Sequence, residues 1–238
     1  MNLTALTLPA DQLLPRLQER IACRNEQINA RDAQYGANRV RVTSYMENIG
    51  WPELLGFDMN RFYSDADFAL ETQLRQKIFW ADNTADDSVI DPSVNASTGM
   101  YYDMTLFGQH IHHTWDGVPQ FEPHPLAQMA HPNPTDLPNW DFAASGDMPQ
   151  LIAQYQSLVE LSRQRYGGAL QVNFPHFHRG PLDIYVQMRG FENFVDDAFE
   201  RPQMVLEFLR FFVDARLRFA QERALHWRGD AAHVIRCR

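Results

Sequence analysis

The 238-residue chain has little cysteine and almost no lysine. Its two cysteines, Cys23 and Cys237, stand near opposite ends of the sequence, which excludes a disulfide framework and a CxxC zinc site. Lys77 is the only lysine among 21 basic residues, and no run of basic residues occurs. Because the formal net charge is also −9, we expect no nucleic-acid partner.

The sequence also lacks a long hydrophobic run. No window approaches the ~20 apolar residues that a membrane-spanning helix needs. The segment Met1–Ala10 has neither the basic start nor the apolar stretch of a secretory signal. We therefore expect a cytoplasmic protein without a membrane partner.

Several motifs that carry known chemistry are missing. The patterns GxGxxG, GxxxxGK[ST], HExxH and GxSxG do not occur, which argues against nucleotide-binding, zinc-peptidase and serine-hydrolase functions. What is present is an ordinary globular composition, with 45% hydrophobic and 21% charged residues. Length and composition predict one large domain or two small ones with a sizeable core, and we expect a single domain over residues 1–238.

Hydrophobic periodicity predicts four long helices, at residues 11–26, 64–81, 147–166 and 202–225. The first of them lies in an N-terminal helical segment, residues 1–35. Pro202 suits the first position of the last helix, where the missing N–H costs nothing.

Three short runs predict strands. Residues 39–45 alternate apolar with polar side chains, residues 88–90 are a short apolar run, and residues 169–174 follow a pair of glycines. Residues 91–146 are rich in proline and irregular, with a short helix expected near 100–107 and strands near 111–115. Strands that alternate with amphipathic helices are typical of an α/β fold with a parallel sheet.

Two histidines follow the last predicted strand. His176 and His178 are spaced as H-x-H, so in an extended backbone their imidazoles point to the same side. The C-terminal ends of parallel strands are where ligands bind in such folds. We predict that this pair binds a substrate carboxylate. The alternatives are two metal ligands or a hydrogen-bonded pair that shapes the loop.

Further candidates are an aspartate and a second group of histidines. Asp91 follows the second predicted strand, where it could bind a cationic or NH-rich ligand; the alternative is a turn residue before a proline. His110, His112 and His113 fit an exposed edge strand, with a metal site or a pH-sensitive lid as the alternatives.

An ordered set of short motifs covers about half of the chain. The set comprises Phe107-Gly108, Phe121-Glu122-Pro123, His124-Pro125-Leu126, Gly180-Pro181-Leu182, Met188-Arg189-Gly190-Phe191-Glu192, Asp196-Asp197 and Arg201-Pro202. In order and spacing it resembles the uroporphyrinogen decarboxylase superfamily. This resemblance implies a (β/α)8 TIM barrel with its site at the C-terminal mouth of the strands.

The resemblance also implies one of two reactions. The first is cofactor-independent decarboxylation of a porphyrinogen-type or other small carboxylate-bearing substrate, and the second is methyl transfer that uses zinc and a corrinoid partner. For decarboxylation, Asp91 would be catalytic and hold ring N–H groups, and Tyr185 would orient the leaving carboxylate. His176 and His178 would bind another carboxylate. Gln187 is the alternative to Tyr185, no metal is expected, and a homodimer is compatible with this function.

The chain departs from the family in two respects. Met46–Leu55 contains no arginine where the family's decarboxylases have an arginine-rich segment, which favours methyl transfer. The chain is also shorter than a complete family barrel, so we expect an incomplete, C-terminally truncated barrel of about five βα units. An irregular tail is expected at residues 225–238. A third hypothesis is an inactive fragment or scaffold that lacks the C-terminal half of the site.

Overall fold

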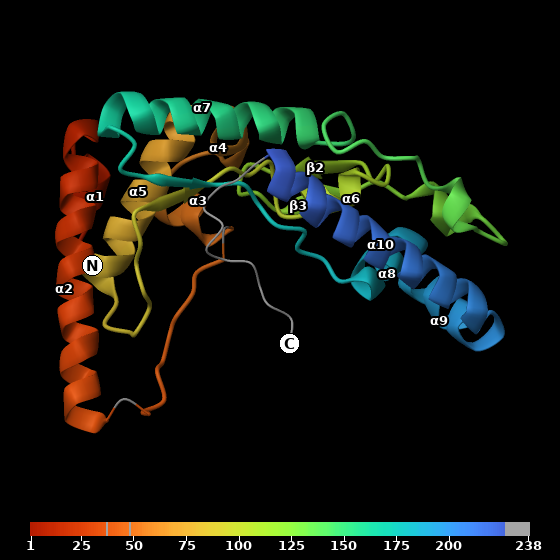
Figure 1. The fold of residues 1–238 in the computed structure, drawn as a ribbon, viewed down its shortest axis with the longest axis horizontal. Helices are drawn as coiled ribbons and strands as arrows, with labels where there is room; N and C mark the ends of the chain where they lie inside the picture. Colours follow the sequence, from red (N-terminus) through yellow and green to blue (C-terminus); the bar gives the residue numbers. More distant parts are fainter. Residues whose placement is uncertain (37, 48, 227–238) are drawn as a thin grey trace. The chain divides into compact units, whose positions relative to one another are not determined.

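The computed structural model describes residues 1–36, 38–47 and 49–226. The protein is mostly helical, with 60% of the described residues in helices and 5% in strands (Figure 1). The chain divides into two compact units. Among the described residues, unit 1 comprises those of 1–95, 115–118 and 154–173, and unit 2 comprises residues 96–114, 119–153 and 174–226. The single domain expected from composition stays a prediction.

Two long helices form the centre of unit 1. Helices α2 (Ala10–Tyr35) and α5 (Ala66–Asn83) lie side by side in Figure 1. The apolar side chains that they bury completely are Leu13, Leu17, Leu70, Leu74 and Ile78. The unit also contains α1 (Thr4–Thr7), α3 (Gly50–Leu55), α4 (Met59–Ser64) and, from Gln154 onward, α7 (Met148–Tyr166).

A buried arginine fastens α2 to the C-terminal end of α5. Arg24 is only 2% exposed. Its guanidinium donates to the carbonyl of Thr84 at 2.9 Å and to the carbonyl of Asp86 at 2.7 Å. The last carbonyls of a helix have no partner inside the helix. Arg24 therefore supplies hydrogen bonds to carbonyls at and just beyond the end of α5, and Arg31 shares the carbonyl of Asp86 with it at 2.7 Å.

The predicted (β/α)8 barrel, complete or partial, is wrong. The described residues contain two sheets of two strands each, and only one of these is parallel. In it, β1 (Ser93–Asn95) pairs with β4 (Gln171–Asn173), and Val94 lies opposite Val172. The parallel strand predicted at residues 169–174 is confirmed. It has one neighbouring strand, however, and a barrel requires two.

The strand predicted at residues 39–45 is also wrong, because an aspartate takes the place of a neighbouring strand. The N–H of Val42 donates to the Asp87 carboxylate at 3.0 Å, and the carbonyl of Val42 accepts from the Asp87 N–H at 2.7 Å. The side chains of Val40 and Val42 are 87% and 66% exposed. The segment therefore has no buried face that could fix a sheet register.

The strand predicted at residues 88–90 is wrong as well, because these residues form no strand. Val89 is 71% exposed, and pairing starts only at Pro92, whose carbonyl accepts from the N–H of Gln171 at 2.9 Å. Since β1 begins at Ser93, Asp91 precedes a strand and does not follow one.

Three consecutive helices form the C-terminal part of unit 2, at the blue end of Figure 1. They are α8 (Pro181–Arg189), α9 (Phe191–Glu200) and α10 (Pro202–His226). The inward face of α10 consists of Val205, Phe208, Phe212, Ala215 and Phe219. This spacing of three and four residues is typical of a helix packed on a core. The long helices predicted from periodicity are thus confirmed.

The remaining elements of unit 2 are short. They are α6 (Tyr102–Thr105), the antiparallel strands β2 (Ile111–His113) and β3 (Pro119–Phe121), and the 3-10 helices η1 (Pro125–Gln128) and η2 (Pro134–Asp136). The short helix expected near 100–107 and the strand expected near 111–115 are confirmed.

Two further predictions concern the membrane and the tail. Among the described residues, no helix has the length and the apolar character that crossing a bilayer demands. Most of the predicted irregular tail, from residue 227 on, lies outside the described residues, and α10 continues through Leu225 to His226.

Candidate functional site

The loop from Phe174 to Gly180 carries the two histidines singled out by the sequence. It follows β4 in the chain and leads into α8, and it belongs to unit 2. His176 and His178 are exposed, whereas Phe177 between them is 6% exposed. The imidazoles therefore lie on the opposite side of the segment from the buried phenyl ring.

Short helix α6 fixes this loop through its backbone. The hydroxyl of Tyr102 donates to the carbonyl of His176. One carboxylate oxygen of Asp103, Oδ2, accepts from the N–H groups of His178 and Arg179, both at 2.8 Å. These bonds pass through main-chain atoms of the loop and not through the imidazole rings. Asp103 is thus a positioning residue for the histidines.

The environment of Asp103 disfavours its ionised form. Its side chain is fully buried, and burial raises the pKa of the carboxyl, although the two N–H groups and the charges of His178 and Arg179 act against this. Among the described residues, its second oxygen, Oδ1, has no hydrogen-bond partner. A buried acceptor without a partner is costly, which also favours a proton on this carboxyl.

A guanidinium group lies next to the histidines in the sequence and is held in place. Arg179 stacks over the ring of Tyr101, with 3.8 Å between its guanidinium carbon and the ring centroid, and it pairs with Asp183 at 3.2 Å. The rings of Tyr102 and His178 meet edge to face at 6.1 Å. The loop thus presents imidazole and guanidinium groups, the donors that recognise carboxylates.

Asp91 lies in unit 1 and is held at the start of β1. Its carboxylate is bound by the ammonium of Lys77 and accepts from the hydroxyl of Ser93 at 2.7 Å. Partial burial opposes ionisation, but these two partners outweigh it and lower the pKa of Asp91. Because it precedes a strand, the argument that placed Asp91 at a ligand-binding mouth no longer supports it, and its catalytic role stays a prediction.

Tyr185 is fully buried within unit 2. Its hydroxyl donates to Asp197 at 2.7 Å, and its ring packs on Phe208 with 4.9 Å between centroids. Burial and the neighbouring Asp197 raise the pKa of the hydroxyl. The predicted role of Tyr185 in orienting a carboxylate stays a prediction, and its alternative, Gln187, is exposed.

Sequence reasoning missed the ionic network to which Tyr185 belongs. Asp197 is fully buried and accepts from Arg189 at 2.7 Å and from Arg201 at 2.6 Å. Burial opposes ionisation of Asp197, but the hydrogen bonds from Arg189 and Tyr185 outweigh it and lower its pKa. Arg189 and Asp197 both belong to the motifs that carry the family resemblance, so the sequence did single them out. It did not show that they form a buried ion pair. Asp103 had no such signal.

The second group of histidines lies on the β2–β3 hairpin. His112 pairs with Glu122 at 2.8 Å across the two strands, and the half-buried His113 has its pKa lowered by burial. Among the described residues, no three histidine, cysteine or acidic side chains gather closely enough to hold a metal ion. The position of His112 and His113 in the short strand β2 therefore agrees with the edge-strand interpretation.

Comparisons of the chain with protein-family models, with curated proteins and with solved structures found no match. The resemblance to the decarboxylase superfamily therefore rests on the short motifs alone and stays a hypothesis. Three of their residues, Arg189, Asp197 and Arg201, form the buried network of unit 2.

The pKa of Asp103 predicts a distinctive pH dependence of stability. Its folded-state pKa lies above that of the unfolded chain, so between the two values the folded state binds more protons and stability falls as pH rises. The variant Asp103→Asn, which keeps an oxygen acceptor, should lack this component. We expect wild-type protein to lose stability relative to Asp103→Asn as pH rises above about 4, measured by urea unfolding. Parallel profiles would contradict the assignment.

Proposed function

We propose that the chain is an enzyme that binds a small carboxylate-bearing molecule at the loop after β4. The observation that supports this is the pair of exposed imidazoles, His176 and His178, on a loop whose backbone is fixed by the buried Asp103. Preorganisation matters because a loop that is already ordered loses little freedom when it binds. Arg179 adds a permanent positive charge to the same loop.

The reaction that we propose is removal of a carboxyl group without a cofactor. In that reaction the bond between the carbon and its carboxylate breaks, carbon dioxide leaves, and the electron pair stays on the carbon. A proton must then be delivered to that carbon. Imidazole is the side chain most often used as a general acid or base. One histidine of the pair would bind a carboxylate, and the other would supply this proton.

Corrinoid-linked methyl transfer has no supporting observation among the described residues. It would need a zinc ion held by histidine and cysteine side chains. The described residues offer no group of three potential ligands.

Removing both imidazoles should strongly weaken the binding of polycarboxylates. A hydrogen bond to a charged group contributes about 1.5–3 kcal/mol, so we expect His176→Ala/His178→Ala to weaken binding by at least about 100-fold. Uroporphyrin, a stable octacarboxylate, and citrate are suitable probes, with affinities measured by fluorescence quenching and calorimetry. Carbon dioxide release from reduced uroporphyrinogen tests the reaction separately.

The matched control is His110→Ala, which removes another exposed imidazole from unit 2. It should leave the affinity for both probes unchanged. Equal affinities for the double variant and this control would overturn the proposed binding site. Binding without carbon dioxide release would retain the site and reject the reaction.

A further inference from the structure

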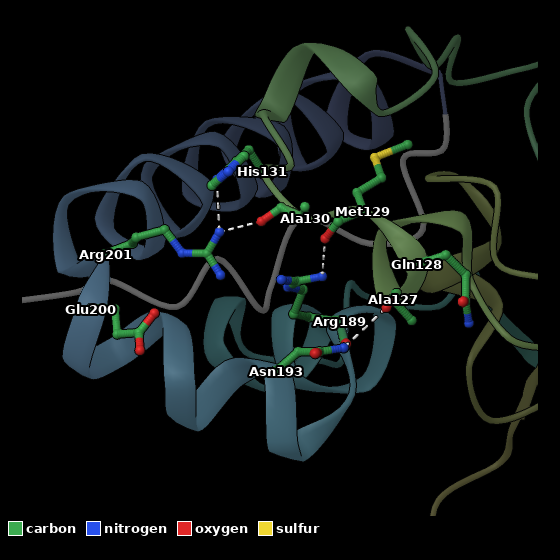
Figure 2. A pocket seen from close by; sticks show the side chains of 9 residues that line it. All are labelled: Ala127, Gln128, Met129, Ala130, His131, Arg189, Asn193, Glu200 and Arg201. Atoms are coloured by element: carbon green, nitrogen blue, oxygen red, sulfur yellow. Dashed lines mark hydrogen bonds between the residues drawn. The ribbon is translucent and has the colours of Figure 1, made fainter.

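Unit 2 contains a cavity that includes no residue of the histidine loop. It has a volume of about 480 Å³ and is lined by the loop Ala127–His131 together with Arg189, Asn193, Glu200 and Arg201 (Figure 2). Sites for small molecules fall in the range of about 300–1,000 Å³. The cavity is therefore large enough for a small metabolite.

The wall of this cavity is formed before any ligand binds, because side chains hold the carbonyls of the loop. Arg189 donates to the carbonyls of Leu126 at 2.6 Å and Met129 at 2.8 Å, and Asn193 donates to the carbonyl of Ala127 at 3.0 Å. Arg201 donates to the carbonyl of Ala130, as the dashed lines in Figure 2 show. Four carbonyls are thus occupied, so the loop itself offers few acceptors to a ligand.

Arg201 retains a donor for a ligand. One terminal nitrogen, Nη1, binds Ala130 and the Nδ1 atom of His131, the latter at 3.0 Å. The other, Nη2, uses one N–H on Asp197 at 2.6 Å. Since each terminal nitrogen carries two hydrogens, one N–H of Nη2 is left. His131 must accept at Nδ1, because guanidinium cannot, so its Nε2 carries a hydrogen and is a second donor.

Glu200 supplies the opposite charge. It is exposed, lines the cavity beside Arg201, and forms no hydrogen bond or ion pair with any described residue. The two guanidinium groups of Arg189 and Arg201 are balanced by the carboxylates of Asp197 and Glu200. A ligand with a net charge would disturb this balance, whereas a ligand with one charge of each sign would not.

We infer that this cavity binds a small zwitterion of the free amino acid class. Its carboxylate pairs with Arg201 and His131, and its ammonium pairs with Glu200. Asp197 and Arg189 act behind them as positioning residues that fix Arg201 and the loop. This inference does not depend on the proposed reaction, because it uses none of the residues of the histidine loop.

The test uses free L-amino acids as probes, each beside its N-acetyl derivative and its carboxamide. Calorimetry should detect binding of at least one free amino acid, and loss of either charge should weaken it about tenfold or more. The variant Glu200→Gln should weaken binding of the free amino acid to a similar degree and leave the weak binding of the N-acetyl derivative unchanged. The Glu200 carboxylate is exposed and has no hydrogen bond or ion pair among the described residues, so this variant is expected to fold.

The matched control is Glu192→Gln, which neutralises another exposed glutamate of α9 outside the cavity. It should bind the free amino acid as wild type does. The inference is overturned if no free amino acid binds at millimolar concentration. It is also overturned if the N-acetyl derivative binds as tightly as the free form, or if both glutamate variants behave alike.

Discussion

Replacement of Asp197 by asparagine is expected to lower the free energy of unfolding of unit 2 by about 3–5 kcal/mol. The reason is the position of this carboxylate between two guanidinium groups and the hydroxyl of Tyr185. Arg189 is 2% exposed, so it would keep its charge in a buried place without an ionised partner. Such a loss approaches the whole stability of a small domain.

The measurement is urea unfolding followed by circular dichroism, with Asp196→Asn as the control. Asp196 is the preceding residue of α9 and is exposed, so its replacement should change stability by less than about 0.5 kcal/mol. If the two variants unfold at the same urea concentration, the buried network does not stabilise unit 2.

Replacement of Arg24 by methionine should have an effect of similar size on unit 1. Methionine keeps the apolar stem but removes every donor, so the carbonyl of Thr84 loses the bond from Arg24 and the carbonyl of Asp86 keeps only the bond from Arg31. Asp86 also loses an ion pair of 3.0 Å in which Arg24 is buried. We expect the free energy of unfolding to fall by about 3–5 kcal/mol, because the Asp86 carboxylate loses its cationic partner and keeps the hydrogen bonds from Ser44 and Ser88.

The control for this prediction is Arg163→Met on the part of α7 that belongs to unit 1. Arg163 is 69% exposed and pairs with Glu160 within one helical turn. Pairs of this kind contribute less than about 1 kcal/mol. A loss at Arg24 no larger than this would show that the end of α5 does not depend on the arginine.

The long helices were predictable because each has a periodic apolar face. The end of α7 is also marked in the sequence, since Gly167 and Gly168 have φ angles of 59° and 78°, which only glycine adopts easily. The details of each face were less certain. On α10, for example, the buried stripe runs through Phe208 and Ala215 and not through Leu209 and Arg216, although either choice satisfies a helical period.

The strands were mostly not predictable, because pairing is decided by distant residues. Val40 and Val42 alternate with arginines as in a strand. Asp87, however, accepts a hydrogen bond from the N–H of Val42 and pairs with Arg39. In the candidate site, the H-x-H spacing was visible in the sequence. The anchor Asp103 was not, because its role depends on a loop more than 70 residues away, as the 75-residue separation of its bond to His178 shows.

On the ribosome, the parts of unit 1 emerge at different times. Strand β1 and its partner β4 are 78 residues apart at the pair Asn95–Asn173. Helices α2 and α5 therefore leave the exit tunnel well before the strand that completes their unit. Until then β1 has an open edge that other chains can join. A nascent chain that stalls before Gln171 is thus the form of this protein most exposed to misassembly and most dependent on chaperones.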